Sequence, residues 1–95
     1  MIQKIWKVEL EIADEQLVIL PKGARILSIQ EQTGKVSMWF QFNQDETRTQ
    51  TYKIRCFGTG QPMFEPETLE YIGTAQVLCG KAVFHYFIDY SYKSE

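Results

Sequence analysis

The feature that most constrains this chain is an alternation of apolar and polar side chains. The clearest case is residues 35–42, in which every second side chain from Val36 to Phe42 is apolar. A period of two is typical of a β-strand that rests one face on a core. Similar segments cover residues 6–12, 17–20, 26–30, 51–56, 69–79 and 82–92. The pattern therefore predicts a chain built almost entirely of strands.

Turn signals separate these segments and define the fold class. Thr33-Gly34 and Gly80-Lys81 are typical of tight turns, because glycine tolerates a positive φ. Residues 65–68 can form one short helical turn, and no longer segment has convincing helical spacing. A length of 95 residues suits one small domain. We expect a single all-β domain over residues 1–95, either an antiparallel β-sandwich or a small barrel of six to seven strands.

The last two predicted strands bear on packing and assembly. Within residues 69–79, Gly73 predicts a bulge or a close approach of another backbone. Residues 82–92 are apolar on both faces, so this strand is either central or covered by a partner chain. We expect a homo-oligomer. The alternation in 69–79 places the following side chains on one face: Leu69, Tyr71, Ala75 and Val77.

Composition excludes several classes of protein. No apolar run approaches the roughly 18–20 residues of a membrane-spanning helix. The first residues lack the pattern of a signal peptide, so we expect a cytoplasmic protein with no membrane partner. A formal net charge of −2 argues against binding to long nucleic acids.

Few residues of the chain could carry catalysis. The single histidine, His85, has no evident nucleophile or carboxylate partner, so we expect a hydrogen-bonded structural histidine. Cys56 and Cys79 lie in apolar segments and are expected as small core side chains. Their spacing from His85 does not form a recognisable metal site, and no cofactor motif is present. We therefore expect a binding protein rather than an enzyme, with no catalytic residue, metal or cofactor.

A glycine-rich turn is the first candidate for a ligand site. Two glycines around a threonine allow backbone N–H groups to converge on an anion, and Lys53 and Arg55 on the preceding strand would add positive charge. Because Arg55 falls on the polar face of its strand, we expect it to contribute to binding and little to stability. The plainer alternative is a glycine-rich strand exit beside a solvated basic face. The turn consists of Phe57, Gly58, Thr59, Gly60 and Gln61.

Aromatic side chains supply the second candidate. They make up 14% of the residues, and Trp39 falls on the polar face of its strand. An exposed tryptophan there would stack on a nucleotide base or lie in a protein interface, and core packing is the alternative. Tyr71 is a second candidate stacking surface.

Several motifs together resemble a group of small phage and prophage proteins of unknown function. The more specific motifs are residues 21–28, which read P-K-G-A-x-I-L-S, and residues 58–62, which read G-T-G-x-P. Gln61 stands where relatives in this group usually carry histidine, so a role that needs an imidazole there is not expected. Shorter matching segments are Ile5-Trp6-Lys7, Tyr71-Ile72-Gly73-Thr74 and Val83-Phe84-His85.

The resemblance extends to viral proteins that evade CBASS and Thoeris antiphage defence by sequestering nucleotide signals. It implies a homo-oligomer, with a tetramer favoured, that acts in the cytoplasm of an infected bacterial host. The implied ligand is a cyclic dinucleotide such as 3′,3′-cGAMP, which is held without being cleaved. The alternative is a phage accessory protein that docks on another protein and binds no small molecule. The residues expected to hold the ligand are Trp39, Lys53, Arg55, Phe57, Gly58, Thr59, Gly60, Gln61 and Tyr71.

Overall fold

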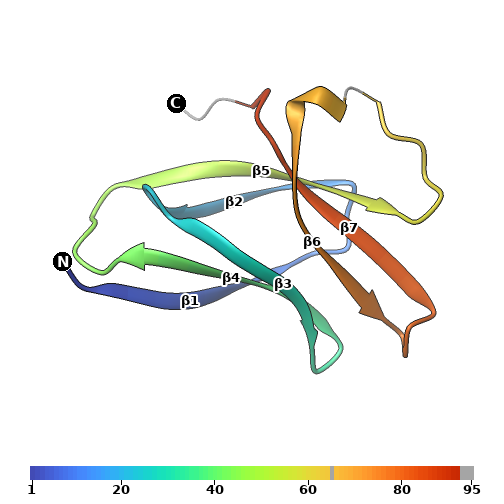
Figure 1. The fold of residues 1–95 in the computed structure, drawn as a ribbon, viewed down its shortest axis with the longest axis horizontal. Coiled ribbons are helices and arrows are strands. Elements are labelled where there is room, and N and C mark those ends of the chain that lie inside the picture. Colours follow the sequence, from blue (N-terminus) through green and yellow to red (C-terminus); the bar gives the residue numbers. More distant parts are fainter. Residues whose placement is uncertain (65, 93–95) are drawn as a thin grey trace.

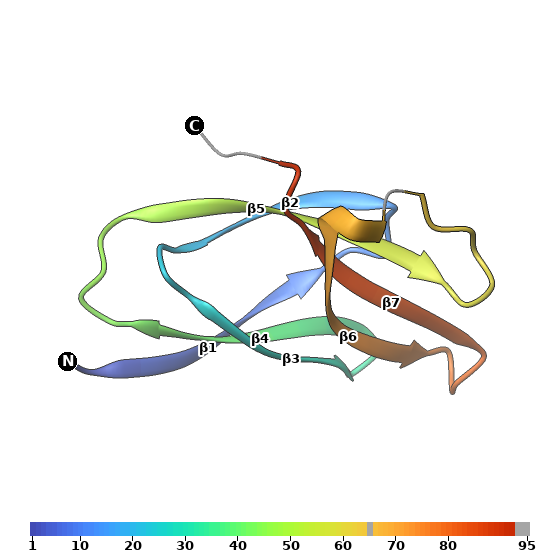
Figure 2. The same cartoon turned by 45° about the horizontal axis from the view of Figure 1, so that its top comes forward.

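The computed structural model describes residues 1–64 and 66–92, and they form a sandwich of two antiparallel sheets (Figure 1). One sheet has three strands and the other has four, so the all-β prediction is confirmed with seven strands among the described residues. The sandwich, and not the barrel, is the correct alternative. A turned view shows the two layers, with β1 (Gln3–Leu10), β4 (Lys35–Asn43) and β3 (Arg25–Gln32) below β2 (Glu15–Pro21) and β5 (Thr49–Gly58) (Figure 2).

The three-stranded sheet is centred on β4 (Lys35–Asn43), which pairs with β1 (Gln3–Leu10) and β3 (Arg25–Gln32). Its alternation is the one that the sequence predicts most clearly: Val36, Met38 and Phe40 are buried against the second sheet, and Phe42 is half-buried. The predicted Thr33-Gly34 turn joins β3 to β4, and both residues have positive φ values, 50° and 84°. This pair of positive φ angles is what a tight hairpin turn with the usual strand twist requires.

The four-stranded sheet has the order β2, β5, β7 and β6. Its strands are β2 (Glu15–Pro21), β5 (Thr49–Gly58), β6 (Leu69–Val77) and β7 (Ala82–Asp89). The doubly apolar strand is therefore central, because β7 lies between β5 and β6. The connection from β5 to β6 passes β7 and contains a short 3₁₀ helix, η1 (Pro66–Thr68). That helix confirms the predicted helical turn except at Glu65, which lies outside the described residues.

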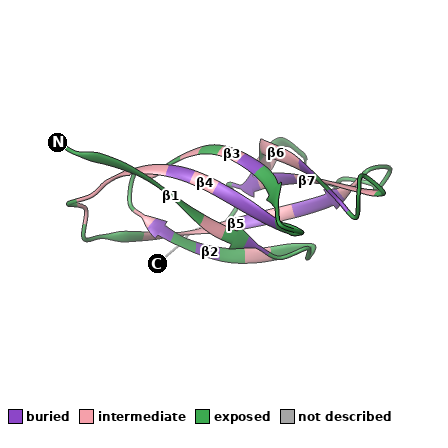
Figure 3. Cartoon of the chain, turned by 90° about the horizontal axis from the view of Figure 1, so that it is seen from below, coloured by how far each residue is buried: buried purple, intermediate pink, exposed green. Residues whose placement is uncertain are grey.

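The core lies between the sheets, where Figure 3 shows buried segments in purple facing one another. The Tyr86 side chain is fully buried, and its hydroxyl donates to the Glu11 carbonyl at 3.2 Å, so its polar group is not left unpaired. Burial raises the pKa of this phenol beyond its ordinary range. The other core side chains are apolar and come from both sheets: Leu10, Val18, Leu20, Ile29, Val36, Met38, Phe40, Ile54, Cys56, Ala75, Val77 and Ile88.

A β-bulge in β6 corrects one predicted face. The pairing of β6 with β7 shifts between Tyr71 and Gly73, so Tyr71 turns away from the face that Ala75 and Val77 share. Gly73 also lies against β3, since a Cβ atom placed there would be 2.6 Å from the Ile29 Cβ. Both alternatives predicted for Gly73, a bulge and a close approach, are present. Strict alternation fails here because one residue is added to the strand.

Three other side chains lie where the alternation does not predict them. Trp6 and Ile12 share the predicted apolar face of the first strand but are 67% and 53% exposed, because the second sheet covers only the end of β1 near Leu10. Cys79 is exposed in the turn between β6 and β7, whereas Cys56 is buried as expected. The core prediction for Cys79 is therefore wrong, because the strand ends at Val77.

Candidate functional site

Five of the predicted ligand residues lie together on the outer face of the four-stranded sheet. This outer face is formed by Lys53, Arg55 and Phe57 of β5, by Thr59 just beyond it and by Tyr71 of β6. The bulge brings Tyr71 opposite Phe87 of β7. The Phe57 and Tyr71 rings both contact Phe87 edge-on, at centroid distances of 5.7 and 5.6 Å. These residues therefore share one face, although β7 and the bulge in β6 lie between Phe57 and Tyr71.

The cations of the outer face are already paired with carboxylates. Lys53 Nζ lies 3.0 Å from Glu15, and an Arg55 guanidinium nitrogen lies 3.7 Å from Asp89. The Arg55 guanidinium also stacks over the Phe57 ring at 5.2 Å. Arg55 Nε has no hydrogen-bond partner among the described residues, but it is buried and cannot be reached by a ligand from solvent. The two cations and two carboxylates balance, so this surface offers a phosphate little net positive charge.

Asp89 is the buried anchor of this outer face. Its side chain is only 5% exposed, and it accepts hydrogen bonds from the Ser91 amide at 2.9 Å and the Ser91 hydroxyl at 2.6 Å. Burial acts to raise the pKa of the Asp89 carboxyl, but the Ser91 hydrogen bonds, with Lys53 and Thr68, bring that pKa below its usual value. The charged form of Asp89 is thus the form that the fold accommodates. Arg55 therefore has a structural partner that the sequence pattern does not reveal.

The glycine-rich turn uses most of its own donors. The Gln61 backbone N–H donates to the Gly58 carbonyl at 3.0 Å. The Gly58 backbone N–H donates to the Gln61 side-chain oxygen at 3.0 Å. The Thr59 amide donates to Val83 at 3.2 Å. Gly60 has φ 90°, which requires glycine at the tip. Because three of the four backbone N–H groups are occupied, the turn is less of an anion cradle than the spacing of its glycines predicts.

His85 links that turn to Tyr71 through a chain of hydrogen bonds. Its Nε2 atom lies 2.9 Å from the Thr59 hydroxyl, and its Nδ1 atom lies 3.0 Å from the Thr74 hydroxyl. The Thr74 hydroxyl in turn lies 2.5 Å from the Tyr71 hydroxyl. Both ring nitrogens of His85 are therefore engaged, which confirms the expected hydrogen-bonded histidine. The chain also fixes the position of the Tyr71 ring at the edge of β6.

Trp39 does not join the other predicted site residues. It lies in β4 of the three-stranded sheet, where its neighbours Met38 and Phe40 are buried, so its own side chain faces away from the core. It lines a shallow apolar surface with Ile5 and Trp6, and Lys7 lies 5.8 Å from its ring. A ligand on the outer face of the four-stranded sheet cannot touch Trp39, because the whole sandwich lies between the two surfaces.

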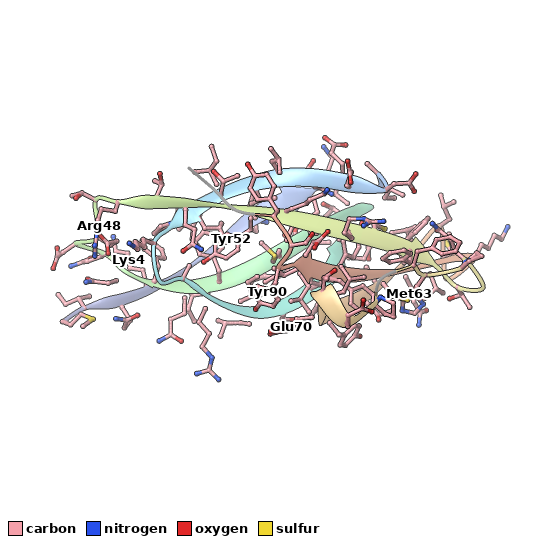
Figure 4. The ribbon with its side chains drawn as sticks, turned by 90° about the horizontal axis from the view of Figure 1, so that it is seen from above. Lys4, Arg48, Tyr52, Met63, Glu70 and Tyr90 are labelled. Carbon is pink, nitrogen blue, oxygen red and sulfur yellow. The ribbon has the colours of Figure 1, made fainter. Side chains whose placement is uncertain are left out.

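A second candidate site is a hollow between the sheets, where the start of β3 faces β5, β6 and β7. Its volume is about 640 Å³. Tyr52 and Tyr90 line it together with charged and amide side chains, and Tyr71, whose ring lies on the outer face against Phe87, borders it. Figure 4 shows Tyr52, Glu70 and Tyr90 in the same part of the molecule. Its polar and charged lining residues are Arg25, Gln50, Tyr52, Glu70, Tyr71 and Tyr90.

Hydrogen bonding and burial set the chemistry of the hollow. The Tyr90 hydroxyl donates to Glu70 at 2.7 Å, and that hydrogen bond, with burial, raises the pKa of Tyr90 to about 12. Burial also raises the pKa of Tyr52. Arg25 forms no ion pair with any described residue, unlike Lys53 and Arg55. The hollow thus combines the Tyr52 and Tyr90 phenols with one oriented carboxylate, and Arg25 is an exposed cation at its rim.

Of the residues of the hollow, the sequence predicts only Tyr71 as a site residue. Tyr52 and Tyr90 occupy apolar faces of their strands, where a tyrosine in place of phenylalanine is the one signal that could mark them. Arg25 and Glu70 look like ordinary surface charges in the sequence. Pairing of β5, β7 and β6 brings Tyr52, Glu70 and Tyr90 to the same region, and the packing of β3 against that sheet adds Arg25.

Other site classes find no support among the described residues. Within residues 1–64 and 66–92, no three side chains of the kinds that bind metals are grouped to hold an ion. In the same residues, no helix has the length and apolar character needed to span a membrane.

Comparison with known proteins identifies a family but no activity. No curated protein and no solved structure matches the chain significantly. A family described as a domain of unknown function matches residues 1–95. Since that match covers the chain from end to end, the protein belongs to the DUF7352 family of domains of unknown function.

Proposed function

We propose that this protein binds a cyclic dinucleotide, such as 3′,3′-cGAMP, in the hollow between its sheets and holds it without cleaving it. The observation that carries the proposal is the grouping of Tyr52, Tyr90, Arg25 and Glu70 around an open space of about 640 Å³. Pockets that hold small ligands measure about 300–1,000 Å³. The hollow is therefore of a suitable size for such a ligand.

The side chains of the hollow match the parts of a nucleotide. Tyrosine rings stack on bases, and a guanidinium binds a phosphate with two parallel hydrogen bonds. Arg25 forms no ion pair with the described residues, so a phosphate there would not compete with an internal carboxylate. The Gln50 amide and the Tyr52 hydroxyl are further groups that can bond to ribose or phosphate oxygens.

The biological setting of the proposal comes from the resemblance to phage proteins. In that setting the protein is made in an infected bacterium and removes a cyclic dinucleotide that signals antiphage defence. Sequestration needs affinity and no chemical step. The proposal moves the site from the glycine-rich turn to the hollow and keeps Tyr71, which lines the hollow, as a shared residue.

The direct test is a titration of the protein with cyclic dinucleotides by calorimetry. Arg25→Ala should weaken binding about tenfold, because a charge-assisted hydrogen bond is lost. Lys22→Ala is the matched control, because Lys22 is an exposed cation on the adjoining turn and does not line the hollow. Ligand recovered after heat denaturation should be intact by chromatography. Equal affinities for both variants, or recovery of a linear product, would contradict the proposal.

A second candidate function is docking on a protein, and an apolar surface on the three-stranded sheet favours it. Ile5 and Leu27 are 60% and 41% exposed, and Ile5 lies with Trp39 in two adjoining shallow depressions. Large exposed apolar side chains gathered on one face are typical of interfaces. We expect the first partner to be a second copy of this chain. β1 is the edge strand beside this surface, and a neighbouring strand can pair with its outer edge.

Light scattering at micromolar concentration tests this second candidate. The unchanged chain should be an oligomer, and Ile5→Lys should shift it toward the monomer, because a charge would be placed in the interface. Lys4→Gln on the same strand is the control. A monomeric unchanged chain would contradict self-association and leave the nucleotide proposal to be judged by its own titration.

A further inference from the structure

One carboxylate stands out among the groups that line the hollow. Glu70 lies in β6 beside the bulge, and one of its oxygens accepts the hydrogen bond from the Tyr90 hydroxyl at 2.7 Å. Each carboxylate oxygen can accept two hydrogen bonds, so both Glu70 oxygens keep capacity for a ligand. No ion pair to Glu70 is present among the described residues, unlike Asp89 and Glu15 on the outer face. Glu70 is therefore an oriented acceptor without a cation.

We propose that Glu70 selects a guanine base in the hollow, an inference that rests on the proposed function. Guanine carries two neighbouring N–H donors on its Watson–Crick edge, and a carboxylate accepts both in parallel. Adenine presents one amino donor beside a ring nitrogen that is an acceptor, and this acceptor would face a carboxylate oxygen. Uracil has one N–H donor between two carbonyl acceptors. Glu70 thus fits guanine, opposes uracil and fits adenine only in part.

Tyr90 is the positioning residue for this recognition. A free glutamate side chain has three rotatable bonds, and fixing them on binding opposes affinity. The hydrogen bond from Tyr90 holds the Glu70 carboxylate before the ligand arrives. Because the Tyr90 pKa is raised to about 12, its hydroxyl keeps its proton and its role as donor throughout the physiological range. Tyr90 therefore acts on the ligand through Glu70 and through the face of its own ring.

The other charged group of the hollow does not duplicate this role. Arg25 is a donor without acceptors, so it matches phosphate oxygens and not the N–H edge of a base. The Gln50 amide and the Tyr52 hydroxyl can donate and accept, and hence do not discriminate strongly among bases. Among the side chains that line the hollow, Glu70 is the acceptor-only group, and base preference should follow it.

The experiment compares cyclic di-GMP, 3′,3′-cGAMP, cyclic di-AMP and cyclic di-UMP by calorimetry with the full chain. The unchanged protein should bind the two guanine-containing ligands at least about tenfold more tightly than cyclic di-AMP, and cyclic di-UMP most weakly. Glu70→Gln should reverse the preference toward cyclic di-AMP, because a glutamine amide pairs with the donor and acceptor of adenine. Glu67→Gln on η1 is the control and should keep the guanine preference, since Glu67 does not line the hollow.

Tyr90→Phe separates positioning from stacking. It keeps the ring but loses the hydrogen bond to Glu70, so guanine affinity should fall about threefold to tenfold while adenine affinity changes little. Circular dichroism and melting temperature verify that each variant is folded. Equal affinity for the four ligands, or a guanine preference that survives Glu70→Gln, overturns the guanine assignment but leaves the proposed function standing. Failure of every cyclic dinucleotide to bind the unchanged protein overturns both.

Discussion

The outer face of the four-stranded sheet and the hollow between the sheets combine the same kinds of side chain in opposite ways. On the outer face, Lys53 and Arg55 are paired with Glu15 and Asp89, and Phe57 is buried beneath the Arg55 guanidinium. In the hollow, Arg25 has no ion pair among the described residues, and the tyrosines surround open space. The outer face pairs its own charges internally, whereas Arg25 has no ion pair among the described residues and the Glu70 carboxylate of the hollow keeps hydrogen-bonding capacity.

The difference shows how a basic and aromatic cluster should be interpreted. Charged and aromatic residues that contact one another contribute to stability, because each group already has its partner. A ligand that entered such a cluster would have to displace an internal contact, and it would gain only the difference between the two. Groups that line open space lose less on binding. The hollow is therefore the better candidate site, although the residue types of the outer face are more conspicuous in the sequence.

The largest expected effect comes from changing the distance between the sheets beside the hollow. Gly73→Ala places a Cβ atom 2.6 Å from the Ile29 Cβ and 3.2 Å from the Ile29 amide nitrogen, so β3 and β6 must separate. We expect a loss of about 3 kcal/mol in the free energy of unfolding, at the upper end of overpacking effects. Urea denaturation measures this loss. Gly34→Ala is the comparison variant, because Gly34 has open space around it but a φ of 84°. It measures the cost of turn strain without crowding.

Arg55→Ala tests the outer face directly. The change leaves the buried Asp89 carboxylate without its ion-pair partner and removes the stacking over Phe57. The free energy of unfolding should fall by about 1–2 kcal/mol, less than for a fully buried pair because the Arg55 side chain is 28% exposed. The affinity of the folded variant for cyclic dinucleotides should stay within about twofold of the unchanged protein. A tenfold weaker affinity at unchanged stability would instead make the outer face the ligand site.

The smallest expected effect is the loss of stability at acid pH that comes from Asp89 on the outer face. Because the pKa of Asp89 is lower in the folded chain than in the unfolded chain, its ionised form contributes stability above about pH 4. That contribution should disappear as the pH falls through the folded pKa. The test measures the melting temperatures of the unchanged protein and of Asp89→Asn between neutral pH and pH values below 4. The difference between the two proteins isolates Asp89, because both contain the same other carboxylates. Parallel curves for the two proteins at acid pH would show that Asp89 adds nothing to acid sensitivity.

The sequence by itself determined the class of the fold and most of its strands. The alternation in Val36 to Phe42 and in residues 82–88 predicts which side chains face the core. This prediction needs only the residues within one strand. The same local rule fails at Tyr71, because the bulge before Gly73 shifts the face by one residue. It also fails at Trp6, because a strand pattern does not state where the covering sheet ends.

Only the tertiary structure decided which charges are paired and which remain available. Arg55 and Arg25 both look like ordinary surface cations in the sequence, Arg55 on the polar face of a predicted strand and Arg25 just before the predicted strand 26–30. The antiparallel pairing of β5 with β2 and β7 brings Glu15 and Asp89 to Arg55, and the packing of β3 over the second sheet leaves Arg25 beside the hollow. Ion pairs and cavities depend on contacts between residues far apart in the chain. Such contacts follow from strand order and register, which a pattern within one strand does not contain.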